Sequence, residues 1–244
     1  MGYIYVDPFH REDAPDFALT NTVRNRRINA EGRPALPIAI LHCNFPSATS
    51  EHPCLLSHKD LRVLFHEFGH CLQQVLTRSP HHNLSGISQL ARDTAEFAGQ
   101  LFEQLSLSEE LLQWLSAHYK TRAPLSRTRL TSALAAIATH TSRDTATLLL
   151  EALFDLELHR SEENGRNAQQ CFETVLQQIP QLQLPAYCRF ANSFDYLVTG
   201  YEASVYAYKW SGVLASKAFK RFGRDGIFNT QTGRELREAF FSGD

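Results

Sequence analysis

The sequence contains few cysteines, and none of them are closely paired. Its five cysteines are odd in number, widely spaced and free of any CxxC pair: Cys43, Cys54, Cys71, Cys171 and Cys188. A disulfide framework or a thiolate zinc site needs paired cysteines, so we expect buried, reduced thiols instead.

An excess of basic charge is also missing. The 24 lysines and arginines nearly balance the 26 aspartates and glutamates, for a net charge of -2, so we expect no nucleic-acid partner and favour small or peptide-like partners. No window reaches the roughly 18 uncharged apolar residues needed to cross a bilayer, so no membrane association is expected. The first residues, MGYIYVDPFHRED, have neither a basic region nor a long apolar stretch. We therefore expect a cytoplasmic location.

The pattern of apolar residues predicts a mostly α fold with a small β contribution near the N-terminus. Residues 1–60 contain the short apolar run ALPIAILHCNF at 35–45, which has the length and isoleucine content of a strand. The expected helices cover 61–76, 91–105, 111–118, 130–160 with an interruption near Thr141 and Ser142, 167–178, 200–222 and 232–241. Because no repeat or low-complexity linker divides the chain, we expect one domain over 1–244, with strands and loops in 1–60 and a helical core in 61–244.

The stretch HEFGH at 66–70 carries the strongest chemical signal. On a helix, residues i and i+4 share a face, so His66 and His70 can bind one zinc ion while Glu67 lies beside a zinc-bound water and takes its proton. Gly69 costs about 1 kcal/mol relative to alanine inside a helix, so we expect another segment to approach it closely. Because HExxH also arises by chance, a surface helix with incidental histidines stays open as an alternative.

A zinc site of this kind needs a third protein ligand, and the next expected helix offers one. In ARDTAEFAGQLFEQ, residues 91–104, polar side chains recur at helical spacing at Asp93, Glu96, Gln100 and Glu103. Beside HExxH, we expect Glu96 to be the third ligand, Asp93 to accept a hydrogen bond from a ligand imidazole, and Glu103 to support the first helix. Taken alone, the stripe is equally typical of a solvated helix face.

Several motifs follow one another in a characteristic order: YVDPFHRE at 5–12, HEFGH at 66–70, SG at 85–86 followed by DTAEFAGQLFE, FDLELH at 154–159 and GYEASVYAYKWSGVLASKAF at 200–219. In this order they resemble the thimet oligopeptidase and oligopeptidase A family of zinc peptidases. The resemblance implies a zincin-like helical core with one zinc ion on His66, His70 and Glu96, and Glu67 as general base. It also implies that Tyr201 and Tyr208 face the substrate carbonyl, and that short peptides are hydrolysed by a zinc-activated water.

The chain departs from the family pattern near these residues while keeping the metal set. Gln73 stands where the family has a third histidine, Ala98-Gly99 where it has Pro-Ser, and Tyr196 where it has a further histidine. Family members are also far longer, with a helical portion that forms the opposite wall of a substrate channel. We therefore expect a partner chain or a second copy to cover that side.

Two alternatives to an active peptidase stay open. One is a truncated, catalytically weak or inactive paralogue that acts as a binding module. The other is a helical protein with no metal.

Overall fold

The computed structural model describes residues 1–87, 90–160, 167–185 and 187–243, and it separates into two compact units. The first unit comprises Met1–Leu130 and Ser211–Asp244, and the second comprises Thr131–Trp210. The expected fold class is confirmed, because helices dominate both units and the strands lie near the N-terminus.

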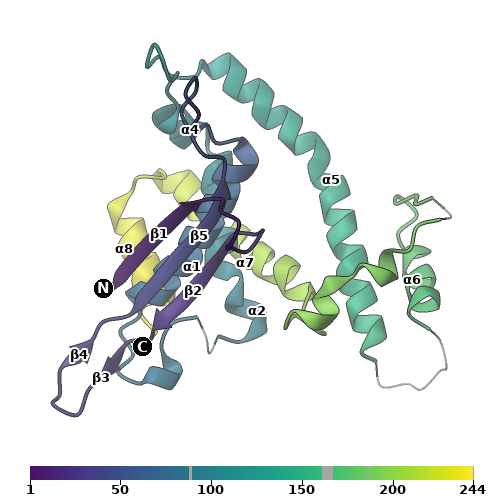
Figure 1. The fold of residues 1–244 in the computed structure, drawn as a ribbon, viewed down its shortest axis with the longest axis horizontal. Helices are drawn as coiled ribbons and strands as arrows, with labels where there is room; N and C mark the ends of the chain where they lie inside the picture. The colour runs from purple at the N-terminus through teal and green to yellow at the C-terminus, as the bar shows by residue number, and fades with distance from the viewer. Residues whose placement is uncertain (88–89, 161–166, 186, 244) are drawn as a thin grey trace. The chain divides into compact units, whose positions relative to one another are not determined.

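A three-stranded sheet forms one layer of the first unit (Figure 1). The strand order is β1-β5-β2, in which β1 (Tyr3–Phe9) runs parallel and β2 (Leu19–Arg24) antiparallel to the central β5 (Ile38–Phe45). The short strands β3 (Arg27–Ile28) and β4 (Pro34–Ala35) pair separately. The strand expected at 35–45 is confirmed as β5, whereas β2 has no counterpart among the expected elements.

Helix α1 (His58–Leu76) packs on one face of this sheet and carries the HEFGH residues. It begins at a capping box, in which the Ser57 hydroxyl accepts from the Asp60 backbone and the Asp60 carboxylate accepts from the Ser57 backbone. Alternate residues of β5 face the helix and form a core with its buried side: Ala39, Leu41, Cys43, Phe45, Cys71 and Val75. The apolar residues that alternate along β5 and those that share one face of α1 thus form a single apolar layer.

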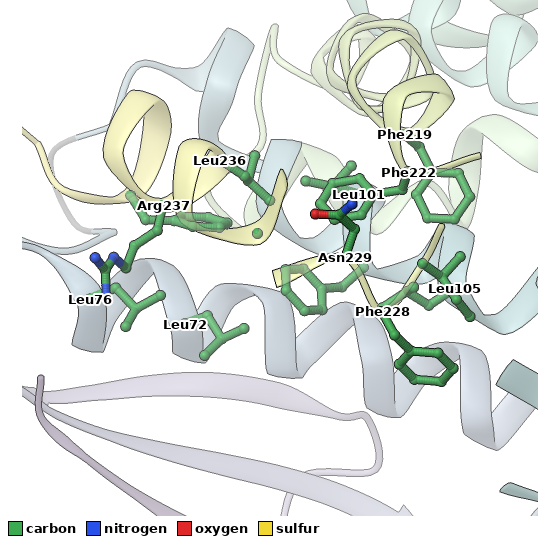
Figure 2. A pocket seen from close by; sticks show the side chains of 14 residues that line it. Leu72, Leu76, Leu101, Leu105, Phe219, Phe222, Phe228, Asn229, Leu236 and Arg237 are labelled. Atoms are coloured by element: carbon green, nitrogen blue, oxygen red, sulfur yellow. The ribbon is translucent and has the colours of Figure 1, made fainter. Parts of the chain in front are cut away.

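Besides α1, the first unit contains further helices, of which the one formed by Phe97–Glu103 packs closely against α1. They are α2 (Arg92–Ala95), α3 (Phe97–Glu103), α4 (Glu109–Leu115), α8 (Thr230–Leu236) with the turn Arg237–Phe241, and the part of α7 (Tyr206–Asp225) after Trp210. Between α1, α3, α7 and α8 lies an apolar cavity of about 320 Å³. Figure 2 shows Leu72 and Leu76 of α1 on one side of it and Leu236 of α8 on another.

The second unit is built on α5 (Arg127–Leu158), which begins in the first unit, and on α6 (Ala168–Leu176). Its core contains the stacked rings of Phe172 and Phe190, with Phe154 fully buried beside them. The expected interruption of this helix near Thr141 and Ser142 is wrong. No proline or glycine occurs between 127 and 158, so the helix continues through these polar residues.

The helix expected at 91–105 is divided in the structure. Glu96 separates α2 from α3, and its backbone, with φ -88° and ψ -4°, departs from helical geometry at this point. All five cysteines are free thiols, but only Cys43, Cys71 and Cys171 are buried as expected, whereas Cys54 and Cys188 are partly exposed. Within the described residues, no helix is both long and apolar enough to span a membrane.

Candidate metal centre

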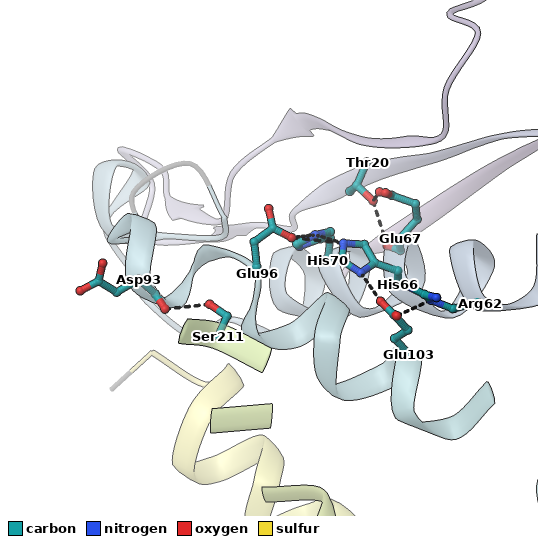
Figure 3. Close-up of polar contacts among 9 residues, drawn as sticks. All are labelled: Thr20, Arg62, His66, Glu67, His70, Asp93, Glu96, Glu103 and Ser211. Carbon is teal, nitrogen blue, oxygen red and sulfur yellow. Dashed lines mark hydrogen bonds and ion pairs between the residues drawn. The ribbon is translucent and has the colours of Figure 1, made fainter. Parts of the chain in front are cut away.

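Three donor atoms from two neighbouring helices converge in the first unit. His66 Nε2 lies 3.2 Å from Glu96 Oε2, His70 Nε2 lies 3.4 Å from the same oxygen, and the two Nε2 atoms are 3.2 Å apart (Figure 3). Both histidines belong to α1, while Glu96 directly precedes α3. The expected ligand residues are therefore brought together at one point.

The spacing and chemistry of these atoms fit a zinc ion. Ligand atoms at about 2.0 to 2.1 Å from a tetrahedral zinc lie about 3.3 Å from one another, close to all three separations. Two imidazoles and one carboxylate are also a donor set that zinc accepts, and a fourth position would remain for a small molecule. The three atoms thus form one face of a tetrahedral site.

Glu103 fixes the orientation of the first histidine. Its Oε2 lies 3.2 Å from His66 Nδ1, and its Oε1 accepts a hydrogen bond from Arg62 Nε. A carboxylate at Nδ1 places the proton there and directs the lone pair of Nε2 toward Glu96 and His70. The contact also joins α3 to α1, because Arg62 and His66 lie one turn apart on α1.

The electrostatics of the centre are those of a cation held among carboxylates. Burial alone would lower the pKa of His66, but hydrogen bonds to Glu103 and Glu96 and the charges of Glu96 and Glu67 raise it to about 10. Burial would raise the pKa of Glu96, yet the hydrogen bonds from His66 and His70 hold it well below its usual range. In the metal-free protein, a proton on His66 therefore supplies positive charge where a metal ion would supply it.

Two glycines let the helices approach closely enough to form the centre. A Cβ on Gly69 would lie 2.3 Å from the carbonyl oxygen of Ala98, which confirms the expected close approach to this glycine. A Cβ on Gly99 would lie 2.7 Å from the His66 ring. The Ala98-Gly99 pair, a departure from the family pattern, is thus in contact with the helix that carries the histidines.

Glu67 extends toward the sheet rather than into the group of three donor atoms. Thr20 Oγ1 of β2 lies 2.9 Å from Glu67 Oε2 and 2.8 Å from the Glu67 carbonyl oxygen. Figure 3 shows this carboxylate beside Thr20, one helix position from His66. Sequence reasoning missed Thr20 because it did not expect β2, although LTNTVR places threonine at alternate positions, so that both threonines share one face of a strand.

Asp93 lies away from the position that we expected for it. Its backbone carbonyl accepts from Ser211 Oγ at 2.7 Å, and Figure 3 shows its carboxylate directed away from both imidazoles. The division between α2 and α3 at Glu96 breaks the helical register that the acidic stripe assumed. The geometry therefore gives the orienting contact with a ligand histidine to Glu103.

A buried amide next to the motif was also missed from the sequence. Gln74 is fully buried, accepts from the Ile87 backbone at 3.0 Å and donates to Asn25 Oδ1 at 2.9 Å. A Cβ on Gly86, whose φ is 76°, would lie 2.0 Å from Gln74 Oε1. The SG pair at 85–86 thus serves to close a loop over α1.

The tyrosines that the resemblance implicates lie in the second unit, where they form one aromatic group. The Tyr201 and Tyr208 rings stack with centroids 5.4 Å apart, and Tyr196 lies 6.0 and 6.1 Å from them. The fully buried Asp155 accepts from the backbone amides of Ala203 and Val205, both at 3.0 Å. These bonds stabilise the turn at Ala203, whose φ is 55°, between Tyr201 and α7.

Comparison with known proteins identifies the family of this chain. The family model described as Peptidase family M3 matches residues 1–243, and the chain therefore belongs to that family. Oligopeptidase A of Salmonella typhimurium strain LT2 is 34% identical over 96% of this chain, and that of Escherichia coli strain K12 is 32% identical over 99%. A probable cytosolic oligopeptidase A of Arabidopsis thaliana is 30% identical over 98%. The chain spans only 35%, 36% and 35% of these three relatives.

Proposed function

We propose that this chain is the catalytic core of a zinc-dependent oligopeptidase that hydrolyses peptide bonds in short peptides. The observation that carries the proposal is the set of three donor atoms on His66, His70 and Glu96, separated by 3.2 to 3.4 Å. Membership of Peptidase family M3 supports the reaction class. Because the chain spans about a third of the relatives' length, the activity, substrates and partners of a whole protein all belong to this proposal.

The residues around the centre divide the work of such a reaction. Zinc held by His66, His70 and Glu96 would polarise the scissile carbonyl and make water acidic enough to lose a proton near neutral pH. Glu67 is the general base in this scheme and not a ligand: its carboxylate would take the proton of the attacking water and give it to the leaving amine. Glu103 keeps the Nδ1 proton of His66 in place.

The tyrosine group is proposed to bind the substrate near its scissile carbonyl. Hydroxyl donors at such a position are each worth about 3 to 4 kcal/mol in the transition state, so we expect Tyr208→Phe to lower kcat by about a hundredfold. Tyr196 stands where the family has a histidine, and a phenol, unlike an imidazole, cannot take up a proton and carry positive charge at neutral pH. We therefore expect weak activity that Tyr196→His increases, measured as kcat on one short peptide.

The second candidate function is a metal-binding module with little or no turnover. It is favoured by Gln73 and Tyr196, which replace family histidines while the metal set remains. The two candidates share the zinc site and differ only in hydrolysis. The expected cytoplasmic location and the absence of a nucleic-acid partner stay predictions in both cases.

One experiment separates these functions. Purified protein is analysed for zinc by mass spectrometry and incubated with an internally quenched peptide of about ten residues, with and without a chelator. One zinc per chain and chelator-sensitive hydrolysis that returns on adding zinc would support the peptidase. Zinc without hydrolysis would favour the binding module, and no zinc at all would contradict both.

A further inference from the structure

We propose that Thr20 is a positioning residue that holds the Glu67 carboxylate in its working orientation, an inference that rests on the function proposed above. Thr20 is on β2 and Glu67 is on α1, 47 residues later in the chain. The Thr20 hydroxyl has one hydrogen, which it shares between Glu67 Oε2 at 2.9 Å and the Glu67 carbonyl oxygen at 2.8 Å. One hydroxyl therefore contacts the backbone and the side chain of the same glutamate.

The sheet register determines that a hydroxyl occupies this position. Thr20 pairs with Leu41 and Thr22 with Ala39, and both β5 residues are in the core beneath α1. Threonines at these two positions consequently share the face of β2 that looks toward the helix. A slip of one residue would place Asn21 or Leu19 there instead, so the contact depends on the observed register.

The contact suits the work that a general base must do. A glutamate side chain has several rotatable bonds, and a hydrogen bond to its charged form restricts them in the partly buried space between strand and helix. Among the residues that the structure describes, the hydrogen bonds of this carboxylate involve Oε2 alone, so the other oxygen is left to take a proton. A hydroxyl at Thr20 thus orients the Glu67 carboxylate while contacting only one of its two oxygens.

Thr22 provides a matched control on the same strand and face. Its hydroxyl donates to Gln74 Oε1 at 3.2 Å and so joins β2 to α1 one turn beyond the centre. Thr20→Val and Thr22→Val each remove one such hydroxyl with nearly unchanged shape. Thr20→Ser keeps the hydroxyl and removes only a methyl group.

The test measures kcat, KM and bound zinc for the zinc-loaded protein and these three variants on one quenched peptide. A hydrogen bond to a charged group is stronger than one between neutral groups, so we expect Thr20→Val to lower kcat by about tenfold or more. The KM and zinc content of this variant should stay close to those of the unsubstituted protein. Thr20→Ser and Thr22→Val should keep most of the activity. Unchanged kcat in Thr20→Val, or equal losses in Thr20→Val and Thr22→Val, would overturn the assignment.

Crystal structures of metal-free Thr20→Val and of the unsubstituted protein provide a readout that needs no activity. We expect the Glu67 side chain to have one conformation in the unsubstituted protein and to leave it, or to occupy several, in Thr20→Val. If Glu67 keeps one unchanged conformation in Thr20→Val, Thr20 does not position it. If the unsubstituted protein hydrolyses nothing while this structural difference is observed, the proposed peptidase function fails and the positioning contact stands.

Discussion

Glu67 differs from the other carboxylates of the centre because it does not join the three donor atoms. Its Oε2 contacts Thr20, whereas Glu96 and Glu103 both contact His66. In the proposed function, this arrangement separates the residue that would transfer protons from the residues that would hold a metal ion.

We therefore expect Glu67→Gln to lower kcat by about a hundredfold or more while zinc remains bound at one ion per chain, since general bases typically contribute that much. The amide is close to isosteric and can still accept from Thr20, so folding should be little affected. Zinc content and hydrolysis are measured on the same preparation. A variant that loses its zinc would show that Glu67 is a ligand or supports one.

His66 gives the centre a dependence on pH. With its pKa raised to about 10 in the metal-free protein, His66 is protonated at pH 7, and zinc must displace that proton. The apparent zinc affinity should therefore rise about tenfold per pH unit between pH 7 and 9, with one proton released on binding. Titration calorimetry in two buffers of different ionisation enthalpy measures the proton directly.

Glu103→Gln is the variant that tests this cause. It removes a carboxylate that raises the pKa of His66, so both the pH dependence of the zinc affinity and the proton release on zinc binding should decrease.

The raised pKa of His66 also determines how the stability of the metal-free fold changes with pH. The contribution of His66 to the metal-free fold is complete below its unfolded pKa of about 6.5 and is lost as the pH rises through about 10. An affinity independent of pH would contradict the assigned protonation state.

At the scale of elements, the sequence predicts the residues of the centre better than the elements that orient them. The spacing of His66 and His70 follows from helix geometry alone, and α1 is long and strongly amphipathic. The role expected of Asp93 assumed one continuous helix from 91, but the backbone changes direction at Glu96. A helical pattern of polar residues in the sequence does not reveal such an interruption.

The same limit applies to the sheet. The apolar run of β5 is evident in the sequence because both of its neighbours are strands and its residues are buried. Strand β2 is mostly exposed and polar, so its sequence signal is weak. Thr20 consequently becomes visible as a partner of Glu67 only once β2 is paired with β5.

The packing of α1 on α3 should be sensitive to a single methyl group. In Gly69→Ala the new Cβ would lie 2.3 Å from the Ala98 carbonyl oxygen, so the helices must separate, at a cost of about 1 to 3 kcal/mol. Zinc affinity should fall as well, because His66 and Glu96 belong to the two helices that move apart. Urea unfolding of the metal-free protein and zinc titration measure the two effects.

Gly223→Ala in α7 is the control for this prediction. A Cβ at Gly223 would meet no atom of the described residues within 4 Å, so the substitution should raise stability by about 0.5 to 1 kcal/mol through helix propensity alone. If Gly69→Ala behaved like Gly223→Ala, the close approach of α3 to α1 would not exist in solution.

At the scale of the whole molecule, apolar surface remains exposed beside the cavity of the first unit. Trp114 is 71% exposed and Phe228 is 53% exposed, and their rings lie 5.8 Å apart. Phe228 also lines the cavity of about 320 Å³ between α1, α3, α7 and α8 (Figure 2). Exposed apolar groups of this kind are typical of surfaces that another chain or ligand covers.

We therefore expect the purified chain to bind the dye anilinonaphthalene sulfonate and to self-associate as its concentration rises, because burial of such rings is favourable. Fluorescence titration and light scattering after size-exclusion chromatography measure the two properties. Phe228→Lys should weaken both, since it places a charge at the edge of the cavity. Phe17→Lys, at a ring that is 66% exposed and does not line the cavity, should leave dye binding nearly unchanged. A monomer at all concentrations that binds no dye would show that this surface needs no cover, and the expectation of a partner chain or second copy would then fail.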